Sequence, residues 1–443
     1  MKKLLFICLI GLFTPYTVHC EPSTVNLLTS LGEDYTRIGG NLHGYEFMPI
    51  NDTPAPKGYV PFYISHYGRH GSRSAFSGKS YELVINTLQH ADSLGVLTPA
   101  GKELLQISRE VLQAYDGMDG RLTDKGEREH ARLAERMYKR FTPVFKGKNP
   151  QVQVLSSMIQ RCLISMAAFT NNLTRQNPRI QYNFDTGERM QPFMSGTGDE
   201  SSIKDRYHAT KDSLLALLPY DSTVVLNRLF TNPSIALAQT TKRLDATSGA
   251  ERISIASLQR AIYDVASVSQ DFDIDCNIFN YLDSATVYYY VMDLTYHIAL
   301  RFANTIGTSE PCVAYAQTAV NDFITKADAA IETGKYVADL RFGHDFTLLC
   351  VASRMGINGV GDRKRPEDLE ASWPVWKNIC MASNLQVIFY RPSQPCIVHR
   401  QPSTDEVLVK VLYNEIERRI NGLTPVQGCY YRWSDVRQLW SQK

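Results

Sequence analysis

The residues best suited to chemistry stand in one short stretch, YISHYGRHGSR, at positions 63–73. Apolar and β-favouring residues run into a turn that places Arg69, His70 and Arg73 around Gly71. Adjacent guanidinium groups disfavour a charged imidazole, so His70 is expected to be neutral and nucleophilic. Because forked guanidinium groups match the oxygens of a phosphate, the turn predicts an anion site that contains a nucleophile.

A second strand is predicted at residues 151–155, where QVQVL leads into Ser156 and Ser157. A helical pattern at 158–170 follows and carries Arg161 one turn inside its start. The first backbone N–H groups of a helix are free to bind anions, so Arg161 and these amides are expected to face the same way. This segment is a second candidate for phosphate binding.

A third strand, predicted at 336–342, ends in Gly343-His344-Asp345 just before another helical stretch. Ligands of open α/β sheets gather at the carboxyl ends of the strands, so His344 and Asp345 are expected to meet the first two segments. Asp345 is the only carboxyl group in this set, and its protonated form is favoured beside a bound phosphate dianion. It is therefore a candidate to give a proton to a departing alkoxide.

Strand and helix patterns alternate along much of the chain, which argues for a parallel sheet covered on both faces. The predicted fold class is α/β, with a mostly parallel, doubly wound sheet and helices on both faces. Strands are predicted at 60–67, 151–155, 336–342 and 385–390, and helices at 81–94, 100–115, 124–141 and 158–170.

Residues 198–332 differ from the rest because long helical windows follow one another with no convincing strand between them. The α/β pattern resumes near residue 335, so a mainly helical cap domain is predicted to be inserted into the core. The predicted division is a signal peptide at 1–20, a discontinuous α/β core at 21–190 and 333–443, and the cap at 191–332.

Two further predictions concern contacts within the sheet. Residues 384–391 and 406–415 are expected to pair as a hairpin at a sheet edge, across a loop that contains proline. Asp339 and Arg341 alternate onto one face of their strand, so a mutual ion pair is expected rather than contact with substrate.

The amino terminus predicts export from the cytoplasm. Two lysines precede a short apolar run, LLFICLIGLF, which is about half as long as a membrane-spanning helix and typical of a signal peptide. Cleavage after Cys20 would leave a periplasmic or secreted protein with no membrane span. The alternative is a lipoprotein in which Cys20 becomes the first mature residue and carries a lipid anchor.

Composition narrows the class of partner. With 44% hydrophobic and 21% charged residues, the 443-residue chain is an ordinary globular protein of two expected domains. Its net charge of +2 falls to zero when Lys2 and Lys3 leave with the signal peptide, so no bulk charge favours nucleic acid. The seven remaining cysteines lack the spacing of a metal site, and their pairing and the oligomeric state stay open.

Several motifs, taken together and in order, resemble the histidine acid phosphatase family. This is branch 2 of the histidine phosphatase superfamily and contains phytases and multiple inositol polyphosphate phosphatases, and a bacterial exported member is expected. The matching pieces are RHGSR (69–73), LTDKG (122–126), SSMIQRCLISMAAF (156–169), FGHD (342–345) and MASNLQVIFYR (381–391).

The resemblance implies a role for each matching residue. His70 would be the nucleophile that becomes phosphohistidine, and Asp345 the proton donor and then the base for water. The phosphate would be held by four side chains, Arg69, Arg73, Arg161 and His344. No metal and no cofactor are implied.

The chain departs from the family pattern at two places. Ala75 stands where the family often has proline, which concerns the stiffness of the loop. The animal inositol polyphosphate phosphatases usually carry His-Ala-Glu where this chain has His344-Asp345, the phytase and acid phosphatase version. The second departure puts the animal enzymes' substrate pattern in doubt.

The predicted function is a metal-independent phosphomonoester hydrolase that acts through phosphohistidine on a small molecule, first on inositol polyphosphates such as phytate. A broad-specificity or sugar-phosphate acid phosphatase is the alternative within this class. Two other classes stay open: a metal-dependent phosphohydrolase that uses His344 and Asp345 as ligands, and a catalytically silent phosphate-binding protein.

Overall fold

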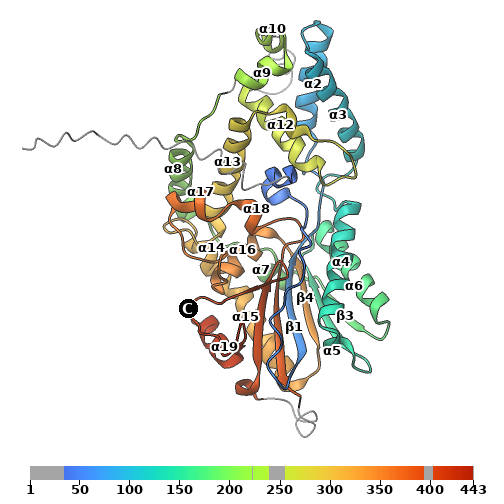
Figure 1. The fold of residues 1–443 in the computed structure, drawn as a ribbon, viewed down its shortest axis with the longest axis vertical. Coiled ribbons are helices and arrows are strands. Elements are labelled where there is room, and N and C mark those ends of the chain that lie inside the picture. The colour runs from blue at the N-terminus through green and yellow to red at the C-terminus, as the bar shows by residue number, and fades with distance from the viewer. Residues whose placement is uncertain (1–33, 222, 239–254, 394–402, 443) are drawn as a thin grey trace, which may run out of the picture.

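The structure, a computed structural model, describes residues 34–221, 223–238, 255–393 and 403–442 (Figure 1). The predicted signal peptide and the possible lipid site at Cys20 lie outside the described residues. None of the helices within the described ranges combines the length and apolar character that a bilayer crossing requires.

The centre of the fold is an eight-stranded sheet in the order β3-β2-β4-β1-β5-β6-β7, with β8 also paired to β6. Neighbours from β3 to β1 are parallel, whereas the pairs from β1 onward through β5, β6, β7 and β8 are antiparallel. The sheet is therefore mixed, and the prediction of a mostly parallel sheet is wrong. The strands are β1 Tyr59–Arg69, β2 Gln151–Ser156, β3 Gln181–Asp185, β4 Ala338–Gly343, β5 Asn384–Pro392, β6 Leu408–Tyr413, β7 Ile416–Arg418 and β8 Tyr431–Arg432.

The antiparallel half arises from local connections near the carboxyl terminus. The predicted pairing of 384–391 with 406–415 is confirmed as β5 with β6, but β7 and β8 continue the sheet beyond it, so this hairpin is not at the edge. Asn414 and Glu415 join β6 to β7 with φ values of 50° and 63°. Two left-handed residues in a two-residue loop match the twist of antiparallel strands, which explains the added strand.

Helices cover both faces of the sheet (Figure 1). The helices α4 (Asp124–Arg140), α5 (Thr142–Phe145) and α6 (Gln160–Gln176) lie on one face, and α15 (Gln317–Thr333), α16 (Asp345–Arg354) and α19 (Trp433–Ser441) on the other. Strand β5 shows why both faces are apolar: Val387 and Phe389 pack into one core, and Ile388 and Tyr390 into the other. Alternate residues of a strand point to opposite faces, so a strand buried on both sides is apolar throughout.

The remaining helices gather mainly beyond one end of the sheet (Figure 1). They include α2 (Lys79–Ser93), α3 (Pro99–Tyr115), α8 (Lys204–Leu215), α9 (Thr223–Leu229), α10 (Pro233–Ala238), α12 (Ile255–Ser269) and α13 (Ser284–Phe302). Among the described residues of 191–332 no strand occurs. Helices α2 and α3 pack against α12, α10 and α9 although they come from the predicted core range. The division into core and cap stays a prediction.

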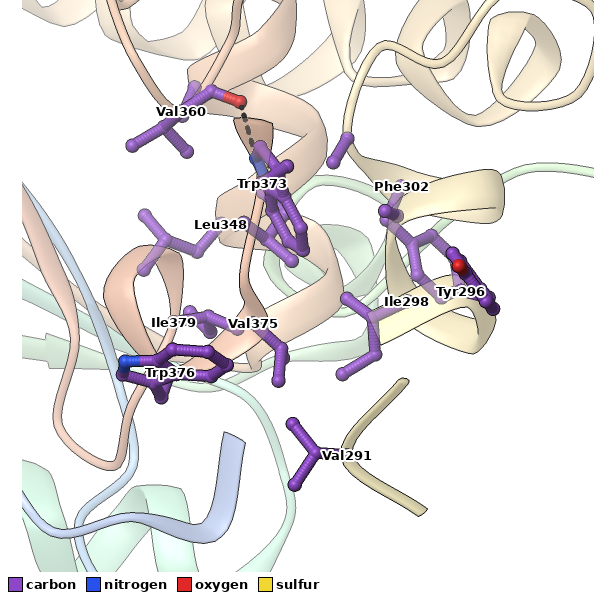
Figure 2. Close-up of a cluster of buried hydrophobic side chains, with 14 of the residues drawn as sticks. Val291, Tyr296, Ile298, Phe302, Leu348, Val360, Trp373, Val375, Trp376 and Ile379 are labelled. Carbon is purple, nitrogen blue, oxygen red and sulfur yellow. Dashed lines mark hydrogen bonds between the residues drawn. The ribbon is translucent and has the colours of Figure 1, made fainter. Parts of the chain in front are cut away.

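An apolar cluster fixes the direction of α16, the helix that begins at Asp345 (Figure 2). Leu348 of α16 lies with Ile298 of α13 and with Trp373, and all three side chains are fully buried. The Trp373 indole donates a hydrogen bond of 3.2 Å to the carbonyl oxygen of Val360. The cluster joins α16 to α13 and to the short helices α17 (Leu369–Ser372) and α18 (Val375–Asn378).

Asp339 and Arg341 do not form the expected mutual ion pair. Arg341 pairs with Asp322 at 2.6 Å, and Asp339 pairs with Lys326 at 3.2 Å and accepts a hydrogen bond from Tyr63 at 2.7 Å. Asp322 and Lys326 both belong to α15. Both charged residues of β4 thus form their ion pairs with α15, the helix that covers their face of the sheet.

Candidate active site

The carboxyl ends of β1, β2 and β4 lie next to one another and bring the three predicted segments together. Arg69 at the end of β1 is in register with Gly343 of β4, and Ser156 of β2 is in register with Phe342. The amide of His70 donates to the carbonyl of Gly343 at 3.0 Å. The sequence-based prediction that these segments meet is confirmed.

His70 is buried and oriented by its own turn. Its Nδ1 lies 2.9 Å from the carbonyl oxygen of Gly71. A carbonyl only accepts hydrogen bonds, so Nδ1 carries the proton and Nε2 keeps a free lone pair. Burial, followed by the charges of Arg69 and Arg161, holds the pKa of His70 well below its usual range. His70 is therefore a neutral imidazole with its nucleophilic nitrogen available.

Gly71 is required by close packing against the start of α4. A Cβ atom at this position would lie 2.5 Å from the carbonyl oxygen of Gly126. The Gly71 amide donates to the hydroxyl of Ser165 in α6 at 3.1 Å. The turn that carries His70 is thus held between α4 and α6.

Asp345 is paired with Arg69 across the site. The Arg69 Nη2 lies 2.8 Å from Asp345 Oδ2, and the Asn41 side-chain amide donates to the same oxygen at 3.0 Å. Burial raises the pKa of Asp345, but Arg69, His344 and the Asn41 hydrogen bond outweigh burial and leave its pKa below the ordinary value. Asp345 is a carboxylate in the ligand-free protein.

Asn41 was not predicted from the sequence. It belongs to a 3-10 helix, η1 (Tyr35–Leu42), and stands 304 residues from Asp345. Its carbonyl oxygen also accepts a hydrogen bond from Arg69 Nη1. No motif surrounds Asn41, so only the folded chain reveals that it orients both members of the ion pair.

His344 is partly buried and lies next to His70. Its Nε2 is 3.0 Å from the hydroxyl of Ser157, and its ring centroid is 5.9 Å from that of His70. Burial, followed by the charge of Arg161, lowers the pKa of His344 to about 4. At neutral pH His344 is therefore an uncharged hydrogen-bonding group.

Arg73 and Arg161 face the site without a carboxylate partner among the described residues. Arg73 donates from Nη1 to the carbonyl of Ser74 at 2.8 Å, and the Nε atoms of both arginines are buried without a hydrogen-bond partner there. Burial, followed by the charge of Arg69, lowers the pKa of Arg73 to about 10, and burial also lowers the pKa of Arg161. Two guanidinium groups that form no ion pair among the described residues and keep N–H donors without partners make this the part of the site that would bind an anion.

Glu129 of α4 holds the turn that follows β1 through hydrogen bonds to Ser72. The sequence did not predict this role. Its carboxylate accepts hydrogen bonds from the Ser72 amide at 2.8 Å and from the Ser72 hydroxyl at 3.0 Å. It accepts a third from the amide of Tyr45 at 2.9 Å. Ser72, which directly precedes Arg73, is thereby fixed by a buried acceptor.

Metal-ligating side chains come together at one other place. In the part of the chain that the structure describes, the one group of three or more such residues is Asp34, His43 and Glu46. Both ring nitrogens of His43 already have partners, Thr36 at 3.1 Å and Glu46 at 2.7 Å. His344 and Asp345 do not belong to this group, so the described residues offer them no third ligand of this kind.

Comparisons with known proteins identify the family to which the chain belongs. Residues 68–414 match the family model described as the histidine phosphatase superfamily (branch 2). Human multiple inositol polyphosphate phosphatase 1 is 24% identical over 256 residues, which cover 54% of this chain and 50% of the human protein. The chain thus matches about half the length of that relative.

Two solved structures share the fold. Multiple inositol polyphosphate phosphatase from Bifidobacterium longum, in complex with inositol hexasulfate, has a TM-score of 0.70 at 19% identity, covering 91% of this chain and 97% of that one. The phytase from D. castellii has a TM-score of 0.64 at 13% identity, covering 92% and 84%. Because the family model matches residues 68–414, which are well over half of the sequence, the chain belongs to branch 2 of the histidine phosphatase superfamily.

Proposed function

We propose that this protein is a phosphomonoester hydrolase that transfers a phosphoryl group first to His70 and then to water. The observation that carries the proposal is the orientation of His70. Its Nδ1–H donates to Gly71 O at 2.9 Å, which leaves the Nε2 lone pair free, and the guanidinium groups that act on His70 include Arg73 and Arg161, whose Nε donors have no partner among the described residues. A nucleophile beside donors for phosphate oxygens is what phosphoryl transfer needs.

The first step forms a bond between His70 Nε2 and phosphorus while the ester P–O bond breaks. The electron pair goes to the leaving oxygen, which takes a proton from Asp345. The charge on the phosphoryl oxygens would be met by Arg69, Arg73, Arg161 and His344. In the second step water attacks phosphorus, the N–P bond breaks, and the Asp345 carboxylate takes the proton from water.

Asp345 must gain its proton when substrate binds. In the ligand-free protein the pKa of Asp345 is lowered, chiefly by Arg69 acting against burial. A bound phosphate dianion adds negative charge beside the carboxyl and competes for Arg69, and both effects raise its pKa. Activity is therefore expected in the acidic range.

Inositol polyphosphates such as phytate are the proposed substrate class. The support comes from the family: the human relative is named a multiple inositol polyphosphate phosphatase, and the Bifidobacterium longum protein is described in complex with inositol hexasulfate. Because His344-Asp345 departs from the animal pattern, broad-specificity or sugar-phosphate hydrolysis stays the alternative.

Phosphate release from a panel tests reaction and substrate together. The panel contains inositol hexakisphosphate, glucose 1-phosphate, glycerol phosphate and phosphotyrosine, each with and without chelator. We expect fastest release from inositol hexakisphosphate and no effect of chelator. Activity that chelator abolishes and a divalent ion restores would support the metal-dependent class, and no release from any compound would support a binding protein.

His70→Ala tests the nucleophile directly. The variant is expected to lose at least about a thousandfold in turnover of p-nitrophenyl phosphate, because no covalent intermediate can form. Its circular dichroism spectrum should match that of the unmodified protein. Full turnover by this variant would refute the assignment.

Export is part of the proposal and needs its own measurement. The short apolar run after two lysines supports a signal peptide. Mass spectrometry of the mature protein should find an amino terminus at Glu21. A lipid-modified Cys20 would support the lipoprotein alternative, and an intact Met1 would contradict export.

A further inference from the structure

We propose that Phe76 is a positioning residue that holds Arg73 and Arg161 in place for phosphate without occupying their hydrogen-bond donors. The proposal rests on the proposed function, because it assigns a role at the same site. Phe76 lies three residues beyond Arg73, outside the RHGSR motif, and its side chain is 62% exposed.

The Phe76 ring makes a cation–π contact with both Arg73 and Arg161. The guanidinium carbon of Arg73 lies 3.8 Å from the centroid of the Phe76 ring, and that of Arg161 lies 5.2 Å from it. Arg73 comes from the turn after β1 and Arg161 from the first turn of α6. Phe76 therefore links two segments that approach the site from different strands.

The third guanidinium is held in a different way. Arg69 forms an ion pair with Asp345 at 2.8 Å, whereas no such pair holds Arg73 or Arg161 among the described residues. A carboxylate beside those two would compete with phosphate for their N–H groups. An aromatic face attracts the cation through its quadrupole and leaves the in-plane N–H donors free.

The structure also explains why the ring stays where it is. The backbone just before it is tied to the loop before α4, through Ser74 N to Arg121 O at 3.0 Å and Gly120 N to Ala75 O at 2.6 Å. A Cβ atom at Gly120 would lie 3.0 Å from Phe76 Cδ1 and 3.8 Å from Arg161 Nη1. Gly120, with a φ of 60°, therefore leaves just enough room for the ring and the guanidinium.

Mutual repulsion makes such a support necessary. Two guanidinium groups that share one site repel each other in the ligand-free protein, and long arginine side chains lose rotamer freedom when they are held in place. The cation–π attraction of the Phe76 ring biases the two side chains toward the binding position.

Binding of inorganic phosphate to three variants tests the proposal by isothermal titration calorimetry. Phe76→Leu keeps an apolar side chain but removes the aromatic face, and it should weaken phosphate binding roughly tenfold. Phe76→Trp restores a face and should stay within about threefold of the unmodified protein. Phe184→Leu is the matched control: Phe184 lies on β3, is 52% exposed and stacks on Tyr182 at 5.5 Å.

Melting temperatures show whether each variant is folded. Because Phe76 is largely exposed, Phe76→Leu is expected to melt within a few degrees of the unmodified protein. Unchanged phosphate affinity in Phe76→Leu would overturn the proposal. A loss in Phe76→Trp as large as that in Phe76→Leu would also overturn it, because that result indicates a purely steric role.

The binding assay separates this proposal from the proposed function. Calorimetry with phosphate needs no turnover, so a protein that hydrolyses nothing in the substrate panel still tests Phe76. A protein that hydrolyses the panel while Phe76→Leu keeps its phosphate affinity would refute this inference alone. In an active enzyme, Phe76→Leu should raise KM for p-nitrophenyl phosphate more than it lowers kcat. Absence of phosphate binding by the unmodified protein would refute the inference.

Discussion

At the scale of single residues, the same buried and positively charged surroundings set the charge states of His70 and Asp345. His70 is kept neutral by burial and by three arginines, and its proton is directed to Nδ1 by Gly71. Asp345 is kept ionised by Arg69 and Asn41 in spite of burial. The nucleophile is therefore ready before substrate arrives, whereas the proton donor becomes ready only with substrate.

Asp345→Asn should separate the two chemical steps. An aryl phosphate has a good leaving group and needs no proton, so it should still phosphorylate His70. An alkyl phosphate should react about 10²–10⁴-fold more slowly, because general acid catalysis is lost. Rapid-quench assays of p-nitrophenyl phosphate and glycerol phosphate, with detection of acid-labile phosphate on the protein, measure both.

Two outcomes of that experiment are decisive. Phosphohistidine should accumulate in Asp345→Asn with the aryl ester, because the base that activates water is also missing. Equal losses on both esters, with no accumulation, would assign Asp345 a structural role through Arg69 instead of proton transfer.

At the scale of elements, each strand end that carries a site residue is held in place by helices that pack against the sheet. Helix α4 supplies Glu129 under Ser72, and α6 supplies Ser165 under Gly71. Helix α16 is held by the apolar cluster around Leu348 and Trp373 (Figure 2). The turn at His70 is thus positioned by helices from one face of the sheet, and Asp345 by a helix from the other.

Glu129→Gln should weaken the support under the turn. The new amide group would face an N–H donor, which leaves a buried hydrogen bond unmade and costs about 1–3 kcal/mol. We expect a lower melting temperature and weaker phosphate binding, because Ser72 adjoins Arg73.

The matched control is Glu135→Gln on the same helix, where Glu135 forms an exposed pair with Lys139. Exposed pairs contribute little, so this change should leave melting temperature and phosphate affinity nearly unaltered. If both substitutions changed melting temperature and phosphate affinity equally, the effect of Glu129 would come from the net charge of helix α4 and not from its hydrogen bonds to Ser72.

At the scale of the whole molecule, buried imidazoles link stability to pH. His130 of α4 packs between Phe169 and Phe342, with ring centroids at 6.4 Å and 5.7 Å. Burial lowers the pKa of His130 to about 3 and that of His66 to about 3. Between these values and the ordinary pKa of 6.5 the unfolded chain binds more protons than the folded one, so stability must fall as pH falls.

His130→Leu should reduce this acid sensitivity. At pH 4.5 the neutral, buried His130 costs about 2–3 kcal/mol relative to an ordinary histidine, because each pKa unit corresponds to about 1.4 kcal/mol. Leucine has no such cost, so the difference in melting temperature between pH 7.5 and pH 4.5 should shrink. Differential scanning calorimetry at the two pH values measures it, and an unchanged difference would contradict the assignment.

The sequence alone determined the local elements and the residues that end them. Periodicity predicted β1, β2, β4 and β5 to within a few residues, and the strand-to-turn junctions marked Arg69, His70, Arg73, Arg161, His344 and Asp345, which the structure brings together. These features are encoded within short windows, and parallel strands place their carboxyl ends at one edge.

The tertiary structure alone decided which distant groups meet. It made the sheet mixed and brought Asn41 into hydrogen-bond contact with Asp345. It also paired Arg341 with Asp322 instead of Asp339, and brought the Phe76 ring into contact with both Arg73 and Arg161. Alternation along a strand shows which face a side chain occupies but not which helix will cover that face. Charges and aromatic rings find their partners only after the apolar faces have packed, because packing sets which groups lose water and must be satisfied.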